Sequence, residues 1–195
     1  AQPEAGADED FERPRTELAD AIIGADNSLI RDLRREDLET IRQGREACWR
    51  TLGDPWPVNE LQQERWFEGL SGKRDEVFFV ADWEDTVIGY GRVHDLSWID
   101  RTGMVTYCIF PASQGQGWGT KLMTLLLDYA FHHLGLERIW AFVMADNAPA
   151  LHVDFKLGFQ QEGLLRKHYF RAGEWKDAVL LGMLLEQWED QTLNA

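Results

Sequence analysis

Apolar residues recur at the period of an α-helix in one stretch of the sequence. Within residues 117–134 they occupy every fourth position, and polar residues fill a second set of positions. The apolar set is Leu122, Leu126, Ala130 and Leu134, and the polar set is Lys121, Thr124, Asp128 and His132. Because this spacing places the two sets on different faces of a helix, we expect an amphipathic helix that packs on a sheet.

Segments with the character of β-strands lie on both sides of this helix. The predicted strands are 28–33, 77–83, 87–94, 103–110, 137–144, 159–170 and 175–185. Further helices are predicted at 38–52, 60–70 and 148–157. Short turns at 84–85 and 172–173 join neighbouring strands as hairpins. This order of elements predicts an α/β protein of the mixed α+β type, with a twisted mixed β-sheet flanked by helices.

Composition divides the chain into a tail and a domain. Residues 1–27 are rich in Asp, Glu, Ala and Pro and contain few large apolar residues, so they cannot bury enough surface to offset the entropy of ordering. A chain of 195 residues leaves little room for a second independent core. We therefore predict an acidic, flexible N-terminal extension at 1–27 and one folded domain at 28–190.

The net charge of −14 narrows the choice of partners. It disfavours nucleic acid and anionic membranes and favours a cationic partner, although the alternative is that the charge only maintains solubility. The longest apolar runs fall well short of the roughly 20 residues that span a bilayer. Residues 1–10 lack the pattern of a secretory signal.

Two cysteines, Cys48 and Cys108, lie in apolar surroundings and lack the spacing of metal ligands. Reduced, packed thiols are typical of intracellular proteins. We therefore expect a cytoplasmic protein without a disulfide or a metal site. As a separate expectation, the protein is a monomer or a homodimer.

A glycine-rich loop connects the strand 103–110 to the amphipathic helix. From Gln114 to Thr120 it runs Gln-Gly-Gln-Gly-Trp-Gly-Thr. The backbone N–H groups that open a helix and the helix dipole favour a phosphate, and glycine lets the backbone approach the anion closely. The loop therefore predicts a phosphate site, although an ordinary strand-to-helix connection has a similar pattern.

Two familiar phosphate motifs fit this loop less well. A Walker loop places Lys before Ser or Thr after its last glycine, whereas Gly119 is followed by Thr120-Lys121. A dinucleotide fingerprint opens a βαβ unit that ends in an acidic residue, whereas Asp146 comes only after four preceding strands. A dinucleotide-binding enzyme remains an alternative.

The loop matches the central motif of the GNAT family of N-acetyltransferases at Gln114, Gly117 and Gly119, and the sequence resembles that family further along. The other matching residues are Asn147, Ala150, Lys156, Leu157, Gly158, Phe159, Glu162, Gly163, Gly173, Asp177 and Glu186. The resemblance covers 29–186 and points to the branch with ribosomal-protein-alanine and spermidine acetyltransferases. It implies an N-acetyltransferase domain in which the fourth and fifth strands splay around acetyl-CoA. The acetyl group would pass to a primary amine by direct attack in a ternary complex.

The resemblance also implies a set of residues that bind acetyl-CoA. These residues are Tyr107, Cys108, Ile109, Phe110, Gln114, Gly115, Gln116, Gly117, Trp118, Gly119, Thr120 and Asn147. Backbone N–H groups of 116–120 would hold the pyrophosphate, and the pantetheine arm would run along 107–110. A main-chain N–H near Ile109 would stabilise the oxyanion that forms at the thioester. For Asn147 the alternative role is a helix N-cap.

The residues expected to move protons depart from the family pattern. Asp154 stands where many members have a Tyr that protonates the leaving thiolate; it would serve as an acid only if desolvated, and a solvated helix residue is the alternative. Met104 stands where polyamine-type relatives often have a Glu. Because its pKa lies near neutrality, His94 is our candidate for the general base. The other candidates are Asp95, Glu60 and Glu64.

The identity of the acceptor stays open between a small amine, an amino sugar and a protein N-terminus. A rival interpretation is a coenzyme A-binding regulatory or structural module that kept the fold and lost turnover.

Overall fold

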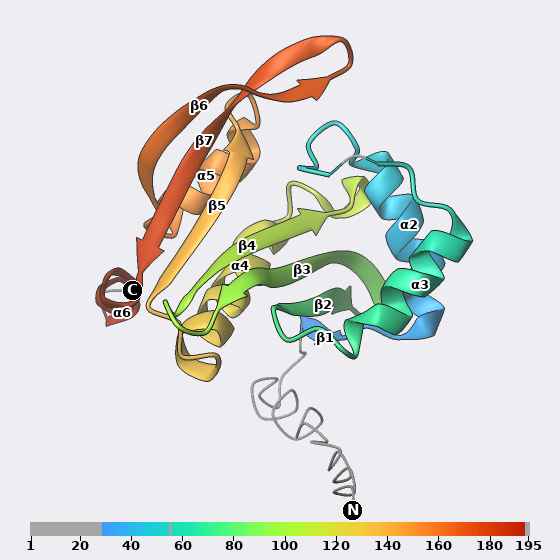
Figure 1. Cartoon of the computed structure of the whole chain (residues 1–195), viewed down its shortest axis with the longest axis horizontal. Coiled ribbons are helices and arrows are strands. Elements are labelled where there is room, and N and C mark those ends of the chain that lie inside the picture. Colours follow the sequence, from blue (N-terminus) through green and yellow to red (C-terminus); the bar gives the residue numbers. More distant parts are fainter. Residues whose placement is uncertain (1–28, 55, 194–195) are drawn as a thin grey trace, which may run out of the picture.

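A seven-stranded sheet organises the part of the chain that the computed structural model describes, residues 29–54 and 56–193. The expected extension at 1–27 lies outside these residues. The strand order is β1-β2-β3-β4-β5-β7-β6, and every adjacent pair is antiparallel except β4 and β5. Figure 1 shows the sheet with helices on both faces. The predicted mixed α+β fold is confirmed.

The elements lie close to where the sequence predicts them. The strands are β1 Ile30–Asp32, β2 Glu76–Trp83, β3 Thr86–Ser97, β4 Thr102–Ile109, β5 Arg138–Met144, β6 Gln160–Arg171 and β7 Glu174–Leu184. The helices are α2 Leu38–Ala47, α3 Glu60–Leu70, α4 Trp118–Asp128, α5 Ala148–Lys156 and α6 Leu185–Leu193. Short helical turns lie at Arg35–Asp37, Pro111–Ser113 and Tyr129–His133. The sequence did not predict α6, and the helix expected at 38–52 ends earlier, at Ala47.

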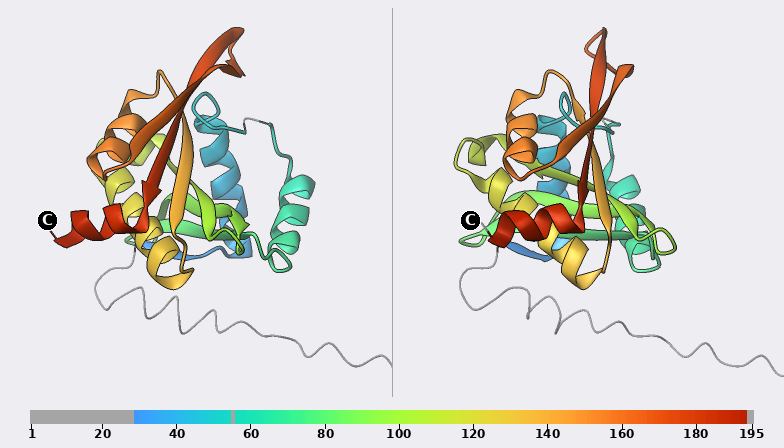
Figure 2. Two further views of the ribbon diagram at one scale, coloured as in Figure 1. Left: turned by 60° about the vertical axis from the view of Figure 1, so that its left-hand side comes forward. Right: turned by 90° about the vertical axis from the view of Figure 1, so that its left-hand side faces the viewer.

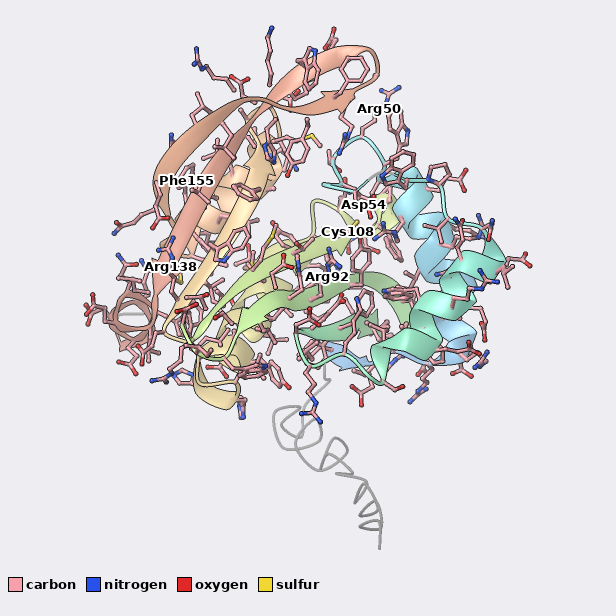
Figure 3. The ribbon with its side chains drawn as sticks, in the orientation of Figure 1. Arg50, Asp54, Arg92, Cys108, Arg138 and Phe155 are labelled. Atoms are coloured by element: carbon pink, nitrogen blue, oxygen red, sulfur yellow. The ribbon has the colours of Figure 1, made fainter. Side chains whose placement is uncertain are left out.

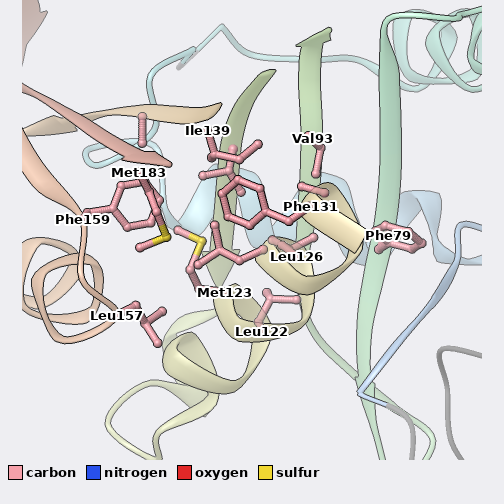
Figure 4. Packing of buried hydrophobic residues seen from close by; sticks show 14 of the residues in the cluster. Phe79, Val93, Leu122, Met123, Leu126, Phe131, Ile139, Leu157, Phe159 and Met183 are labelled. Carbon is pink, nitrogen blue, oxygen red and sulfur yellow. The ribbon is translucent and has the colours of Figure 1, made fainter. Parts of the chain in front are cut away.

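Helices α4 and α5 cover one face of the sheet, and α2 and α3 lie on the other, as the two views in Figure 2 show. The larger core fills the space between α4 and the sheet, where Leu122, Met123, Leu126 and Leu127 are fully buried (Figure 4). Each such side chain stabilises the fold by about 1.5–3 kcal/mol through burial alone. The predicted apolar stripe therefore fixes α4, and the loop that precedes it, to the middle of the sheet.

Strands β4 and β5 pair over a short distance and then diverge. Their partners are Thr102 with Arg138, Gly103 with Ile139, and Met104 with Trp140. β4 continues beside β3 to Ile109, whereas β5 continues beside β7 to Met144. A V-shaped gap between the two arms of the sheet is visible in Figure 1. This confirms the splayed fourth and fifth strands that the resemblance implies.

Candidate active site

One edge of β4 presents main-chain N–H groups to the gap. In the ladder between β3 and β4, the N–H of Phe110 donates to the carbonyl of Ile88 at 2.8 Å. Hydrogen-bonded pairs alternate along an antiparallel ladder, so the N–H of the preceding residue, Ile109, points to the opposite edge. That edge borders the space from which β5 has diverged. A fixed donor aimed into the gap is what an oxyanion requires.

The glycine-rich loop opens α4 beside the same gap. Gly115 and Gly117 have φ angles of 77° and 83°, a left-handed conformation that glycine adopts at little cost. Gly117 is the N-cap of α4, and no side chain caps this end of the helix. A Cβ atom at either glycine would meet nothing within 4 Å. The start of α4 is therefore uncapped by side chains and uncrowded at these two glycines, as a helix end that binds a phosphate would be.

Two contacts tie this loop to β4. The side-chain amide of Gln114 donates to the carbonyl of Ile109 at 2.8 Å. The ring of Tyr107 lies so close that a Cβ atom on Gly119 would be 3.3 Å from it. The loop and the Ile109 N–H are thus held around one gap, and the amide nitrogen of Gln114 is engaged within the protein.

The strand residues expected along the pantetheine arm divide between the two faces of the sheet. Tyr107 and Ile109 belong to the core beneath α4, whereas Cys108 and Phe110 pack against α2. A hydrogen bond with the neighbouring thiol of Cys48, together with burial, raises the pKa of Cys108. At Cys108 and Phe110 only the main chain borders the α4 side of the gap.

Asp154 is completely buried, with 0% of its surface exposed, so the alternative of a solvated helix residue is wrong. No described residue forms a hydrogen bond with either carboxyl oxygen. Desolvation raises the pKa of Asp154 to about 7, so the carboxyl is partly protonated at neutral pH. The charge of Asp154 contributes to the raised pKa of Tyr107, which burial dominates. A carboxyl that lacks a partner is thus placed beside the donor side of the gap.

Asn147 caps α5. Its side-chain oxygen accepts a hydrogen bond from the N–H of Ala150 at 3.4 Å, and its own N–H donates to the carbonyl of Met144. The N-cap role is confirmed, and a contact with the cofactor stays a prediction.

His94 lies on the face of β3 opposite α4, and it is 8% exposed. Its Nδ1 atom is 3.0 Å from the carboxylate of Asp95, and its Nε2 atom is 2.9 Å from the hydroxyl of Thr106. With the Nδ1 proton directed to the carboxylate, Nε2 accepts from the hydroxyl. Burial and the charge of Arg92 lower the pKa of His94, so the imidazole is neutral at neutral pH. The three groups form a hydroxyl–imidazole–carboxylate relay.

The other candidates for the base lie elsewhere. Glu60 is exposed at the start of α3, and Glu64, one turn later, pairs with Arg35. The carboxylate of Asp95 is hydrogen-bonded to Nδ1 of His94, so Asp95 would act on an amine only through that imidazole.

Sequence reasoning missed Thr106 and Arg92, which are cross-strand partners in β4 and β3. Both side chains share the face of the sheet that carries His94. The available signal was the alternation along the two strands, but alternation identifies partners only after the register between them is known.

A comparison with known protein families decides the assignment of this site. The family model described as "Acetyltransferase (GNAT) domain" matches residues 28–160. The chain belongs to the GNAT family. This GNAT protein is therefore an acetyl-CoA-dependent N-acetyltransferase that transfers an acetyl group to an amine.

Curated relatives of this GNAT enzyme include proteins with different acceptors. It is 30% identical over 158 residues to the L-amino acid N-acetyltransferase AaaT of Escherichia coli, covering 78% of this chain and 95% of the relative. It is 26% identical over 162 residues to the spermidine N(1)-acetyltransferase of Vibrio cholerae, covering 82% of this chain and 94% of the relative. The structure of a V. cholerae spermidine N-acetyltransferase in complex with CoA and spermine superposes with a TM-score of 0.76 at 24% identity, over 82% and 96% of the two chains.

Two further observations concern the described residues of the GNAT enzyme. Within them, every helix is too short or too polar to cross a membrane. No group of three or more His, Cys, Asp or Glu side chains in this part of the chain is arranged to hold a metal ion.

Proposed function

We propose that this enzyme acetylates the primary amine of a small molecule by direct attack within a ternary complex. The observation that carries the proposal is the gap between β4 and β5, which has donor groups on one side and a proton relay on the other. The α4 loop and the Ile109 N–H border the side where acetyl-CoA would bind. The relay through Thr106 and His94 occupies the opposite face of β4. An amine that arrives on that face meets the thioester without a covalent enzyme intermediate.

In this proposal the hydroxyl of Thr106 accepts the proton of the attacking amine and passes its own proton to Nε2 of His94. The carboxylate of Asp95 holds the imidazole in the tautomer that can accept this proton. The positive charge of Arg92 lowers the pKa of His94 and would lower that of a bound ammonium group in the same way. Thr106 is therefore the catalytic group that touches the amine, and His94 is the base behind it.

On the donor side, the Ile109 N–H stabilises the oxyanion at the thioester, and Asp154 supplies a proton to the departing thiolate. A pKa of about 7 suits the second role, because a substantial fraction of the carboxyl carries a proton at neutral pH. The orphaned oxygens of Asp154 support a partner from outside the described residues. Backbone groups of 116–120 bind the pyrophosphate, and Asn147 orients the pantetheine arm.

Two broader features belong to the same proposal. Residues 28–190 form the catalytic unit, which is supported by the single sheet that runs from β1 to β7. A cytoplasmic location is supported by the two buried free thiols, Cys48 and Cys108.

The proposal is tested by supplying acetyl-CoA with separate amines and measuring both thiol release and the mass of the product. The panel comprises polyamines, L-amino acids, amino sugars and short peptides. We expect thiol release that depends on one class of amine and a product heavier by one acetyl group. Release at the same rate with and without every amine would contradict acetyl transfer to these acceptors.

A further inference from the structure

We propose that the acceptor carries a carboxylate next to its amine, and that Arg92 binds this carboxylate. The inference rests on the proposed function, because it assigns a second group of the acceptor to the face that holds the Thr106–His94 relay. It names amino acids as the substrate class.

Arg92 lies on the acceptor side of the sheet. Successive residues of β3 point to opposite faces, and Val93 is buried in the core beneath α4. Its neighbour Arg92 therefore points to the other face, together with Tyr90 and His94. Figure 3 shows Arg92 and Cys108 on the neighbouring strands β3 and β4, in the arm of the sheet that β1 to β4 form. The Arg92 side chain is 28% exposed, so its guanidinium is accessible to a ligand and partly desolvated.

Cations gather around Glu76 and Tyr90 on this face. The buried carboxylate of Glu76 accepts from Lys73 at 2.6 Å and from Nη1 of Arg92 at 3.0 Å. Two cations thus share one carboxylate. A third cation, Arg45, donates to the hydroxyl of Tyr90 at 3.2 Å. Burial raises the pKa of Tyr90, and the charges of Arg45 and Arg92 both oppose that shift.

This arrangement disfavours a polycationic acceptor. A polyamine needs carboxylates along its path, but Glu76 is already paired twice, Asp95 is hydrogen-bonded to His94, and Met104 offers no charge. The strong negative charge of the whole protein therefore does not extend to the floor of the acceptor face. An acceptor with an anionic group would satisfy the donors that Arg92 retains, because a guanidinium has five N–H groups and its bond to Glu76 uses Nη1.

The neighbouring positions of Arg92 and Thr106 fit an acceptor whose carboxylate lies close to its amine. Arg92 and Thr106 are direct cross-strand partners, so their Cβ atoms lie about 4.5–5.5 Å apart. Thr106 is the group assigned to the amine. A ligand whose amine contacts Thr106 and whose anionic group pairs with the neighbouring Arg92 can therefore be short, as an α-amino acid is.

The first test compares ligands and leaves the protein unchanged. Initial rates are measured for a series of L-amino acids, for the carboxamide of each, for spermidine and for glucosamine 6-phosphate. We expect kcat/KM for the best amino acid to exceed that for its carboxamide by about 100-fold, because the amide cannot form the charged pair. Equal rates for acid and amide, or a preference for spermidine or the sugar phosphate, would overturn the inference and leave acetyl transfer itself intact.

The second test changes the protein. Arg92→Met should lower kcat/KM for the amino acid about 100-fold more than it lowers kcat/KM for the carboxamide, which shares any change in the pKa of His94. Arg138→Met is the matched control, because Arg138 is 32% exposed and also pairs with a Glu, but its strand partner is Thr102 at the closed end of the gap. If Arg92→Met fails to fold, Arg92→Lys tests the same point, because Lys cannot form a bidentate pair with a carboxylate. An equal loss for acid and amide in either Arg92 variant would contradict binding of the carboxylate.

Discussion

The two sides of the gap between β4 and β5 present different kinds of chemical group, main-chain groups on one side and side chains on the other. On the proposed donor side, the groups that would face acetyl-CoA are main-chain N–H groups of the α4 loop and of Ile109, and glycines shape the loop. On the acceptor side they are side chains, with Thr106, His94 and Arg92 contributed by two strands. The donor site therefore depends on backbone conformation, and the acceptor site on side-chain identity.

This difference explains how one family serves many acceptors. Main-chain donors bind the same pyrophosphate whatever side chains surround them, so substitutions nearby leave the donor site in place. Side chains on the acceptor face can change one at a time without disturbing the loop. In this chain Met104 stands where the resemblance implies that polyamine-type relatives often have a Glu, and the Thr106–His94 pair lies on the same face.

The largest effect is expected when a negative charge is introduced at Gly117, the N-cap of α4. Gly117→Asp and Gly117→Asn both introduce residues that tolerate a left-handed N-cap, and open space surrounds the position. The two variants differ only by the charge of the carboxylate. We expect the dissociation constant of CoA to rise about 1000-fold for Asp, since one like charge at about 4 Å costs roughly 4 kcal/mol at an effective dielectric constant of 20. The measurement is titration calorimetry with CoA.

Gly117→Asn provides the control for this experiment, and we expect it to weaken CoA binding less than about tenfold. Thermal unfolding of both variants checks that α4 still forms. Similar affinities for CoA in the Asp and Asn variants would contradict a pyrophosphate at this helix end.

The same contrast decides what the sequence could predict. The place and backbone conformation of the α4 loop were predictable because a glycine pattern between a strand and a helix encodes local backbone geometry, and 114–120 are consecutive. The acceptor side was not, because Glu76, Arg92 and Thr106 are distant in sequence and only the strand register brings them together. A shift of one residue would have moved these side chains to opposite faces.

The burial of single polar residues also could not be predicted from the sequence. Asp154 sits on a short helix of nine residues, and its burial depends on how α5 packs on α4. A carboxylate in such a helix is more often solvated, and no neighbouring residue signals the exception. Helix α6 was missed for a related reason, because its anchor is one buried side chain, Trp188.

A smaller effect is expected when the proton relay on the acceptor side is cut. Thr106→Val removes the hydroxyl and keeps the shape of the side chain, whereas Thr106→Ser keeps the hydroxyl. We expect kcat to fall about 100-fold in the Val variant and less than about threefold in the Ser variant, because general base catalysis requires a group that can accept the proton. Both variants should bind CoA as the wild type does.

The pH dependence of kcat/KM sharpens this second test. The pKa of His94 is lowered by burial and by Arg92, so the relay is competent only above that lowered pKa, and the wild-type rate should rise with pH through it. His94→Gln and Thr106→Val should both lose this rise. If the rate still rises with pH in both variants, the relay is contradicted, and Glu60 or Glu64 becomes the candidate for the general base.

The smallest effect on rate is expected at Asp154. Asp154→Asn keeps the shape of the side chain and removes the proton, and we expect kcat to fall about tenfold, because a thiolate leaves without strong acid assistance. The wild-type kcat should decrease above a pH of about 7, where the carboxyl loses its proton, and the variant should lack this decrease. An identical pH profile in the two proteins would contradict the role of Asp154 as the acid.

Stability measurements separate this chemical role from the burial of Asp154. Its folded pKa of about 7 lies well above the ordinary value near 4, so the folded state binds the proton more tightly than the unfolded state does. The stabilising contribution of the protonated carboxyl is therefore complete below pH 4 and disappears as the pH rises through 7. Relative to Asp154→Asn, the wild type should lose roughly 4 kcal/mol of unfolding free energy between pH 4 and pH 8. Denaturant unfolding at a series of pH values measures this difference, and parallel curves for the two proteins would show that the carboxyl is solvated and cannot hold a proton for the thiolate.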